Sequence, residues 1–365
     1  MRPLRLCVIG AGSWVAVSHL PNLAERRDVV EFVGVCRLGG DRLRHMQERW
    51  GFRIASEDYR VVLDLEPDIV VVASPAALHH EHAMAALQCG AHVLVEKPFT
   101  LRSGEAWALV REAARVGRHL VVSFGYNYRP AVTLAKDAFD RVGGIGAIEF
   151  ASIEMSSTTR DLLAGVGSYP SADPDVPPDT ATWTDPALAG GGYAHAQLTH
   201  ALGALLWISG LQGEEVCAQL SNVGAPVELY TAAHVRFAGG AIGTIAGSAT
   251  HRAADGRDVL TLAMTGAEGE LRVECHNDAV RLFRRGVGAV AVDVPPGGGA
   301  YDCDGPVHAL VDLALGRRSA SSSPGDLGAR TVEILEALYQ SAASRQGELV
   351  GPRPEPAGSS PSRRP

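Results

Sequence analysis

The chain has 365 residues, of which 46% are hydrophobic and 20% charged, and its formal net charge is -8. This length predicts two globular domains, and the acidic balance argues against nucleic-acid binding, which requires a basic surface. No apolar run reaches the roughly eighteen residues of a membrane span, and the first residues do not resemble a secretory signal. The six cysteines include no C-x-x-C pair, so we expect no metal site. We therefore expect a cytoplasmic protein that does not bind a membrane.

Short apolar runs alternate with helical patterns through the first third of the chain. The runs are residues 6–9, 30–36, 69–73, 92–95 and 120–123. Such alternation indicates crossover units on a parallel sheet, and we assign residues 1–125 to this α/β domain. Ligands bind at the carboxyl ends of the strands in sheets of this class. The residues that follow four of these runs are therefore candidate site residues, namely Gly10, Arg37, Ser74 and Lys97.

The pattern changes after about residue 125, and we assign residues 126–350 to a second, α+β domain. It begins with a helix, a strand near 147–155 and a polar loop over 156–182, which we expect to be functional or mobile. A helix over 190–209 precedes six candidate strands with short turns, which indicate a mostly antiparallel sheet. Two helices near 304–315 and 326–345 follow, and we expect the second to pack on the first domain. Residues 351–365 are rich in Pro, Ser and Arg and are expected to be disordered.

A glycine turn follows the first predicted strand. Gly10-Ala11-Gly12-Ser13-Trp14-Val15 supplies two glycines of the G-x-G-x-x-G pattern between a strand and a helix. The first glycine permits a tight turn, and the second lets a pyrophosphate approach backbone N–H groups at the helix N-terminus. The third glycine is absent, so an ordinary strand-to-helix turn is an equal alternative. The turn favours a Rossmann dinucleotide-binding domain in which Gly10, Gly12, Ser13 and Trp14 contact the cofactor.

Arg37 ends the second predicted strand, where an NAD-specific site commonly has Asp or Glu. A guanidinium pairs with a 2′-phosphate, whereas a carboxylate accepts hydrogen bonds from a ribose diol. Arg37 therefore favours NADP(H), with NAD(H) possible. The alternative is a solvated surface arginine.

The run Val93-Leu94-Val95-Glu96-Lys97-Pro98 ends a strand with an acid, a lysine and a proline. Proline restricts its own backbone and that of the preceding residue, so Lys97 leaves the strand end at a set angle. Such a lysine can exchange a proton with an alcohol or ketone, and desolvation would lower its pKa toward the working range, whereas Glu96 would raise it. Lys97 is our catalytic candidate, and a solvated lysine is the alternative.

Further candidates lie on three predicted segments. On a helix entered through Gly190-Gly191-Gly192, the residues Tyr193, Gln197 and His200 share one face, and His195 does not. After the strand at 120–123, the run Tyr126-Asn127-Tyr128-Arg129 supplies two phenols, an amide and a guanidinium, and these groups suit a hydroxyl-rich ligand. We expect His79 to line the cofactor cleft, with His80 and His82 exposed. The remaining predicted cofactor contacts are Ser74, Pro75, His79, Glu96, Lys97, Pro98 and Asn127, and the predicted substrate contacts are Lys97, Tyr126, Asn127, Tyr128, Arg129, Tyr193, Gln197 and His200.

The combination of G-A-G-S at 10–13, S-P-A-A-L-H at 74–79, G-A-H-V-L-V-E-K-P at 90–98 and G-G-G before His200 resembles the glucose-fructose oxidoreductase and inositol dehydrogenase family, Gfo/Idh/MocA. The resemblance implies an N-terminal Rossmann domain and a C-terminal domain with a large open antiparallel sheet. It also implies nicotinamide-dependent redox chemistry on sugars, cyclitols or related polyols, and a homo-oligomer, dimer or tetramer, formed through that sheet. By this likeness, Lys97 corresponds to the lysine that hydrogen-bonds the reacting oxygen, and His200 to the histidine that ends the D-x-x-x-H motif.

One position departs from that motif, because the chain has A-Q-L-T-H, with Ala196 in place of the acid. A glutamine cannot exchange a proton, so acid-base work would fall to Lys97 and His200. We expect an NADP(H)-dependent oxidoreductase acting on a secondary alcohol or ketone. Two alternatives stay open: a catalytically inactive nicotinamide-binding sensor or assembly subunit, and a hydrolase that uses bound nicotinamide for transient oxidation.

Overall fold

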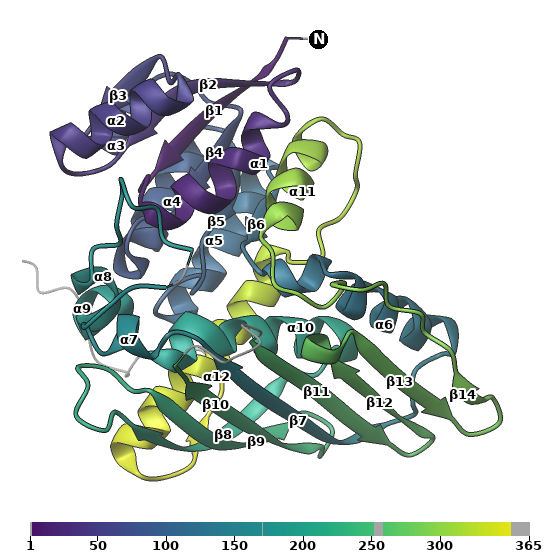
Figure 1. The fold of residues 1–365 in the computed structure, drawn as a ribbon. Coiled ribbons are helices and arrows are strands. Elements are labelled where there is room, and N and C mark those ends of the chain that lie inside the picture. The colour runs from purple at the N-terminus through teal and green to yellow at the C-terminus, as the bar shows by residue number, and fades with distance from the viewer. Residues whose placement is uncertain (1, 170, 252–257, 352–365) are drawn as a thin grey trace, which may run out of the picture.

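The computed structural model describes residues 2–169, 171–251 and 258–351 (Figure 1). The expected tail at 351–365 therefore lies outside the described residues, apart from Gly351. The N-terminal part contains a six-stranded parallel sheet with the order β3-β2-β1-β4-β5-β6. Its strands are β1 (Leu4–Ile9), β2 (Val30–Cys36), β3 (Ile54–Ser56), β4 (Ile69–Val72), β5 (His92–Val95) and β6 (Leu120–Val122).

Helices cover both faces of this sheet, which is why its central strands are apolar on both sides. Every residue of β4 is buried, as are the last three of β5 and all of β6, as expected for a parallel sheet between two helical layers. The helices are η1 (Val15–His19), α1 (Leu20–Ala24), α2 (Gly40–Trp50), α3 (Tyr59–Leu63), η2 (Ala76–Leu78), α4 (His79–Gln88) and α5 (Ser103–Val116). The predicted Rossmann-type α/β domain is confirmed.

The C-terminal part contains a nine-stranded sheet with the order β14-β13-β12-β11-β7-β10-β9-β8-β15. Neighbouring strands are antiparallel except β7 and β10, which pair in parallel. The large, mostly antiparallel sheet is therefore confirmed. Its strands are β7 (Ile148–Ser157), β8 (Gly213–Ser221), β9 (Tyr230–Phe237), β10 (Ile242–Ala249), β11 (Val259–Gly266), β12 (Gly269–Glu274), β13 (Ala279–Arg284), β14 (Gly288–Val290) and β15 (Glu348–Leu349).

Helices lie on the face of the second sheet that is turned toward the first sheet, and the opposite face is open (Figure 1). Burial alternates along β9 and β10 accordingly, as it does in a sheet with one covered face. The longer helices are α6 (Pro130–Arg141), α10 (Thr199–Ser209), α11 (Asp304–Ala314) and α12 (Gly325–Ser344), and the short ones are η3 (Gly125–Tyr128), α7 (Arg160–Leu163), α8 (Ala181–Thr184), α9 (Pro186–Ala189), η4 (Ala194–Leu198) and η5 (Cys275–Asn277).

The last long helix, α12, joins the two parts of the molecule. Glu336 accepts a hydrogen bond from the backbone N–H of Ser103 at 2.9 Å, and Glu333 accepts one from the indole N–H of Trp107 at 2.7 Å, both on α5. On the other side, the backbone N–H of Ala218 in β8 donates to the Ser341 hydroxyl at 2.9 Å. The helix thus holds the carboxyl edge of the first sheet over the second. Across the residues that are described, no helix is long and apolar enough to cross a membrane.

Candidate functional site

Two cavities meet beyond the carboxyl ends of the parallel strands. The first has a volume of about 420 Å³ and is lined by the glycine turn, the ends of β2, β4 and β5, and the region between Leu163 and Trp183. The second, of about 350 Å³, extends toward the second sheet. Four residues line both cavities: Trp14, Lys97, Tyr169 and Trp183. The junction of the cavities is therefore built from aromatic rings and one amine.

The glycine turn leaves room for a ligand at the start of η1. Gly10 has a φ of +88°, and a Cβ there would lie 2.2 Å from the backbone nitrogen of Ser74, so only glycine allows β1 to lie this close to β4. A Cβ on Gly12 would meet nothing nearer than the Gly10 carbonyl at 3.9 Å. Val15 and Ala16, which stand where the third glycine is missing, are fully buried in the core and pack the start of the helix against the sheet. The turn therefore fits a dinucleotide pyrophosphate.

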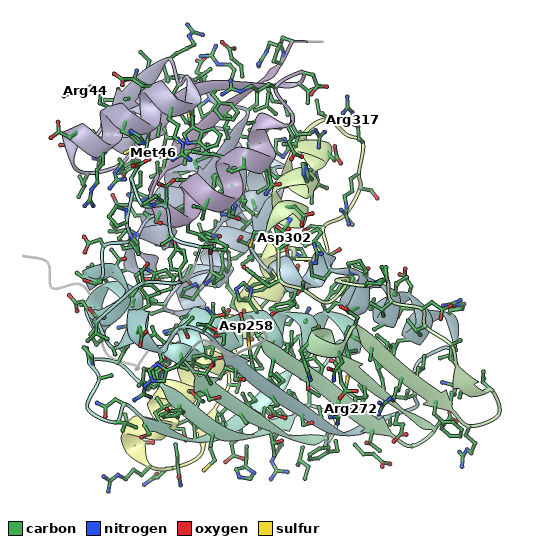
Figure 2. All side chains as sticks on the ribbon, in the orientation of Figure 1. Arg44, Met46, Asp258, Arg272, Asp302 and Arg317 are labelled. Atoms are coloured by element: carbon green, nitrogen blue, oxygen red, sulfur yellow. The ribbon has the colours of Figure 1, made fainter. Side chains whose placement is uncertain are left out.

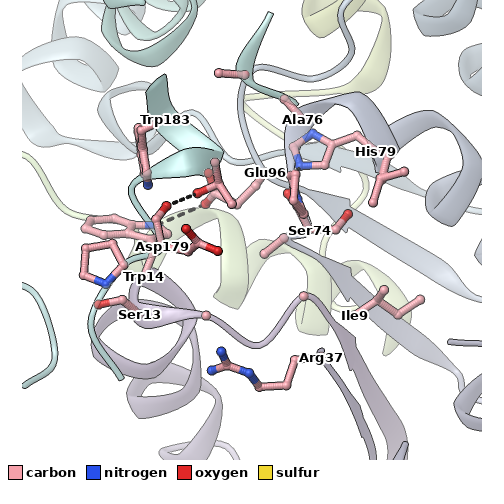
Figure 3. Close-up of a pocket in the computed structure, with 18 of the residues that line it drawn as sticks. Ile9, Ser13, Trp14, Arg37, Ser74, Ala76, His79, Glu96, Asp179 and Trp183 are labelled. Atoms are coloured by element: carbon pink, nitrogen blue, oxygen red, sulfur yellow. Dashed lines mark hydrogen bonds between the residues drawn. The ribbon is translucent and has the colours of Figure 1, made fainter. Parts of the chain in front are cut away.

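Arg37 lies in the wall of the first cavity with Ser13 and Asp179 (Figure 3). Its Nη1 donates to the carbonyl of Ala11 at 3.0 Å, and its Nε donates to the carbonyl of Leu38 at 3.1 Å. Burial lowers the pKa of the guanidinium, and the nearby charge of Asp179 opposes that effect. The side chain is therefore anchored beside the glycine turn, where a ribose end of a dinucleotide would lie.

Glu96 organises the floor of the first cavity (Figure 3). The carboxylate accepts a hydrogen bond from the Trp14 indole at 3.1 Å and from the backbone N–H of Lys97 at 3.0 Å, and it lies 2.7 Å from Nε2 of the buried His19. Burial alone would raise the pKa of Glu96, but the hydrogen bond and charge of His19, with the charge of Lys97, lower it to about 2. Glu96 thus stays ionised and holds Trp14 in place. The sequence offered no signal for His19.

The Lys97 amine lies at the junction of the two cavities. It donates a hydrogen bond to the backbone carbonyl of Ala196 at 2.9 Å, and it lies 5.6 Å from the centre of the Trp183 ring. Burial lowers the pKa of this amine, and Glu96 raises it. The amine is therefore partly buried and held by a backbone acceptor. Pro98, which follows, is buried and lines the first cavity.

Histidines brace the ends of β4 and β5. His79 is buried, with Nδ1 lying 2.8 Å from the carbonyl of Pro98 and Nε2 lying 2.7 Å from the carbonyl of Ser74, and it lines the first cavity with Ser74 and Pro75. The expectation that His82 is exposed is wrong, because its ring packs on Tyr59 and its Nδ1 lies 2.9 Å from the Ser74 hydroxyl. The spacing of three residues puts it on the same helix face as His79.

The predicted common face of Tyr193, Gln197 and His200 is only partly present. Residues 194–198 form a π turn, which is wider than an α-helical turn and changes the facing of the residues that follow. Gln197 and His200 line the second cavity, and His195 lines the first. Tyr193 is fully buried outside both cavities and accepts a hydrogen bond from the Ser157 hydroxyl at 3.2 Å. Its predicted substrate contact is therefore corrected to a packing role.

Four substrate contacts were predicted at residues 126–129, and of these only Tyr126 lines the second cavity. Asn127 is fully buried and donates to the carbonyls of Gly203 and Ser322 at 3.2 and 2.9 Å. The Tyr128 hydroxyl lies 2.6 Å from that of Ser321. The Arg129 guanidinium lies 3.5 Å from the carboxylate of Asp304. These three side chains contact α10, the loop at 321–322 and the start of α11, and they do not line either cavity.

His200 has a partner that the sequence did not reveal. Its Nε2 lies 3.3 Å from the hydroxyl of Tyr301, which in turn lies 2.8 Å from the thiol of Cys303. Burial, together with the charge of Lys97, lowers the pKa of His200 well below its ordinary value. The imidazole is therefore neutral near pH 7 and can accept or pass on a proton. Tyr301 lies about a hundred residues further along the chain, and no local motif marks it.

Other residues that line the cavities come from the polar loop and from the second sheet. The loop supplies Leu163, Tyr169, Pro177, Pro178, Asp179, Thr182 and Trp183 to the first cavity. It is held at the glycine turn by Asp173, whose N–H donates to the Ser13 hydroxyl at 3.1 Å and whose carboxylate pairs with Arg49 at 2.5 Å. The second cavity also contains Thr158, Thr159, Asp258 and His276. The loop's length without periodicity was the signal for its involvement, and none of its residues was predicted.

Comparison with known proteins follows the same division of the chain. Residues 4–124 match the oxidoreductase family with the NAD-binding Rossmann fold, and residues 163–272 match the Gfo/Idh/MocA C-terminal domain. The chain belongs to the Gfo/Idh/MocA family. The predicted resemblance is thereby confirmed.

Curated members of the Gfo/Idh/MocA family are similar over parts of their length. D-glucoside 3-dehydrogenase of Escherichia coli (strain K12) is 32% identical over 127 residues, which are 34% of this chain and 36% of that protein. Levoglucosan dehydrogenase of Pseudarthrobacter phenanthrenivorans is 30% identical over 256 residues, which are 61% of this chain and 60% of that protein. The match thus spans less than two thirds of either relative.

Solved structures show the same fold over nearly the whole chain. GenD2 from gentamicin A biosynthesis, in complex with NAD, has a TM-score of 0.75 at 24% identity, with 96% of this chain and 97% of that one covered. Levoglucosan dehydrogenase in complex with NADH and L-sorbose has a TM-score of 0.74 at 23% identity, with 95% and 99% covered. The two-part architecture is therefore that of the Gfo/Idh/MocA oxidoreductases.

Proposed function

We propose that this protein is a cytoplasmic NADP(H)-dependent oxidoreductase that moves a hydride between nicotinamide and a secondary alcohol or ketone of a sugar, cyclitol or related polyol. The observation that carries the proposal is the Lys97 amine, which lies at the junction of a cavity that fits a dinucleotide and a second cavity rich in hydroxyl and aromatic groups. The names of the similar proteins, dehydrogenases of glucosides and of levoglucosan, support the substrate class.

A nicotinamide bound in the first cavity would supply or accept the hydride. The chain's own residues would handle the proton at the reacting oxygen. Lys97 would donate it to a ketone or accept it from an alcohol, and burial favours the uncharged amine that the second direction needs. His200 would hold the same oxygen or relay the proton, with Tyr301 fixing its ring. Gln197 and Tyr126 would shape the pocket around the substrate.

The preference for NADP(H) rests on Arg37, which is anchored beside the glycine turn. A guanidinium there would pair with the 2′-phosphate of the cofactor, and NAD(H) would bind more weakly.

We also propose that the protein forms a homo-oligomer, a dimer or a tetramer, through the open face of the second sheet.

Replacement of Lys97 with Met tests the function. With NADP⁺ and a panel of neutral sugars and inositols, we expect the variant to lose about a hundred- to ten-thousand-fold in kcat, which is the usual contribution of positioned proton transfer. Affinity for NADPH should stay within about threefold, since the pyrophosphate turn is untouched. Lys136→Met is a matched control, because Lys136 is the chain's only other lysine and pairs with Asp140 on α6.

Three outcomes would contradict the proposal. A wild-type rate in Lys97→Met would remove Lys97 from the chemistry. Binding of NADPH without oxidation or reduction of any substrate would indicate a sensor. Conversion of a glycoside without net change in cofactor absorbance would indicate a hydrolase that oxidises its substrate transiently.

A further inference from the structure

We propose that Asp258 is the specificity-determining residue of the second cavity, and that the substrate is an uncharged cyclic polyol that presents a pair of hydroxyl groups to this carboxylate. The inference rests on the proposed function, because it assigns the substrate class of the same site. It concerns the end of the substrate that is remote from the reacting carbon.

The position of Asp258 separates it from the redox junction. The residue lies immediately before β11, on the side of the second sheet that faces the first sheet (Figure 2). It lines the second cavity and is not among the residues that line the first, whereas Lys97 lines both. A substrate whose reacting oxygen is at Lys97 would therefore meet Asp258 with another part of its ring.

The carboxylate of Asp258 is oriented and half-buried. The backbone N–H of Thr158 donates to its Oδ1 at 3.1 Å. Burial raises the pKa of the Asp258 carboxyl, and the Thr158 hydrogen bond opposes that effect. An ionised carboxylate has about four acceptor positions, so the one hydrogen bond that it accepts from the described residues leaves capacity for two hydroxyl donors of a ligand. A half-buried carboxylate gains from such donors because burial weakens its solvation.

The other walls of the second cavity fit a neutral ring. Among the described residues of its lining, Asp258 is the one acid and Lys97 the one basic side chain apart from histidines. An anionic group placed near Asp258 would be repelled, and the arginine forks that commonly bind phosphate or carboxylate are absent from the described lining. The rings of Trp14, Tyr169 and Trp183 offer apolar surface to the C–H face of a sugar ring.

Affinity measurements on cofactor-loaded protein test the assignment. NADPH-loaded wild type, Asp258→Asn and Asp258→Ala would be titrated with D-glucose, D-galactose, myo-inositol, D-glucosamine, D-glucuronate and D-glucose 6-phosphate, with binding followed by saturation-transfer NMR. Asp137→Asn is the control, since it removes an exposed acid on α6. Thermal unfolding would show that each variant is folded.

We expect at least one neutral polyol to bind wild type about tenfold more tightly than the two anionic sugars, and Asp258→Asn to weaken that binding by about tenfold, a typical effect of losing hydrogen bonds to a charged group. Asp137→Asn should not change it. The inference is overturned if no neutral polyol binds, if an anionic sugar binds as tightly, if Asp258→Asn leaves affinity unchanged, or if D-glucosamine binds more than tenfold tighter than every neutral polyol.

Turnover distinguishes this inference from the redox proposal. Binding that depends on Asp258 without any change in cofactor absorbance would overturn the oxidoreductase function and support the Asp258 assignment. Cofactor reduction whose KM is insensitive to Asp258→Asn would support the oxidoreductase function and overturn the Asp258 assignment.

Discussion

The amine of Lys97 has the backbone carbonyl of Ala196 as its hydrogen-bond partner. A carbonyl is neutral, so it holds the amine in place without adding the charge that would keep it protonated. Burial therefore lowers the pKa of Lys97 from its ordinary value of 10.5. A base with a lower pKa is available for alcohol oxidation closer to neutral pH.

This arrangement predicts a pH profile. The kcat/KM for alcohol oxidation should rise with pH through an apparent pKa below 10.5, as Lys97 loses its proton. Ala196→Asp would place a negative charge beside the amine, favour its protonated form and shift the profile to higher pH. Ala196→Asn is the control, because its side chain has nearly the size of Asp without the charge. This variant should shift the pH profile much less. Identical profiles for the Asp and Asn variants would show that charge at position 196 does not act on Lys97.

Arg37 predicts the order of cofactor affinities. Wild type should bind NADPH more tightly than NADH, and Arg37→Asp should reverse the order, by about tenfold or more in each direction, since a carboxylate repels the 2′-phosphate and accepts from the ribose diol. Fluorescence titration of both cofactors measures this. Arg44→Asp makes the same charge change on the exposed side of α2 and serves as control. Equal affinities in wild type would contradict the assignment.

Glu96 links stability to pH. Its pKa falls from an ordinary 4.5 to about 2 in the folded chain, so its ionised form stabilises the fold above pH 4.5 and this contribution is lost as the pH falls toward 2. The shift corresponds to about 3 kcal/mol of unfolding free energy. Glu96→Gln should therefore be less stable than wild type at pH 7, and the difference should shrink as the pH falls. Urea unfolding at pH 7 and pH 3 measures it, and a constant difference would contradict the linkage.

At the scale of elements, the start of η4 is held by a clamp of Glu228 and Tyr339. Glu228 accepts hydrogen bonds from the N–H groups of Gly192 and Ala194 at 2.7 and 3.0 Å, and from the Tyr339 hydroxyl at 2.5 Å. The glycines make this possible, because a Cβ on Gly191 would lie 2.2 Å from the Tyr339 oxygen. The clamp positions the turn that carries the Ala196 carbonyl and leads into α10, on which His200 lies, so the G-G-G run acts on the site through packing.

Substitution of Gly192 tests the clamp. A Cβ there would lie 2.1 Å from the carbonyl oxygen of Glu228, so Gly192→Ala must move backbone and should cost about 1–3 kcal/mol of stability as well as kcat. Gly104→Ala in α5 is the matched control, since a Cβ there meets nothing within 4 Å, and it should be neutral or stabilising by up to about 1 kcal/mol. Thermal unfolding and kcat measure both variants. Equal stability of the two would contradict the packing argument.

At the scale of the whole molecule, the open face of the second sheet exposes small and apolar side chains among charged ones such as Glu154, Arg236 and Arg272. Ala246 of β10 pairs with Ala232 of β9 at its centre, and Phe150, Ile242 and Phe283 are exposed. Such a face is typical of an interface between chains. We expect light scattering to show a dimer or tetramer, and Ala246→Arg to shift it toward the monomer, because a long side chain at the centre of the face would keep two such faces from fitting together. A monomeric wild type would contradict the oligomer proposal.

Much of the fold and part of the candidate site could be predicted from local sequence. The glycine turn, Arg37 and Lys97 were predictable because each lies within two residues of a strand end, and parallel strands bring their carboxyl ends to one edge. The same reasoning failed after β6 and at η4. There, the chain forms a 3₁₀ turn and a π turn, and these pack against elements that are distant in the sequence, α11 in the first case and β7 and β10 in the second.

The sequence by itself determined the parallel sheet, the open antiparallel sheet and the residues at the strand ends, since these depend on short apolar runs and on the backbone freedom of glycine and proline. Only the tertiary structure decided that Tyr301 reaches His200, that Asp258 lines the second cavity, and that the Ala196 carbonyl holds Lys97. Each of these contacts either joins positions far apart in the chain or depends on a main-chain atom. Contacts of these two kinds leave no local pattern of side chains in the sequence.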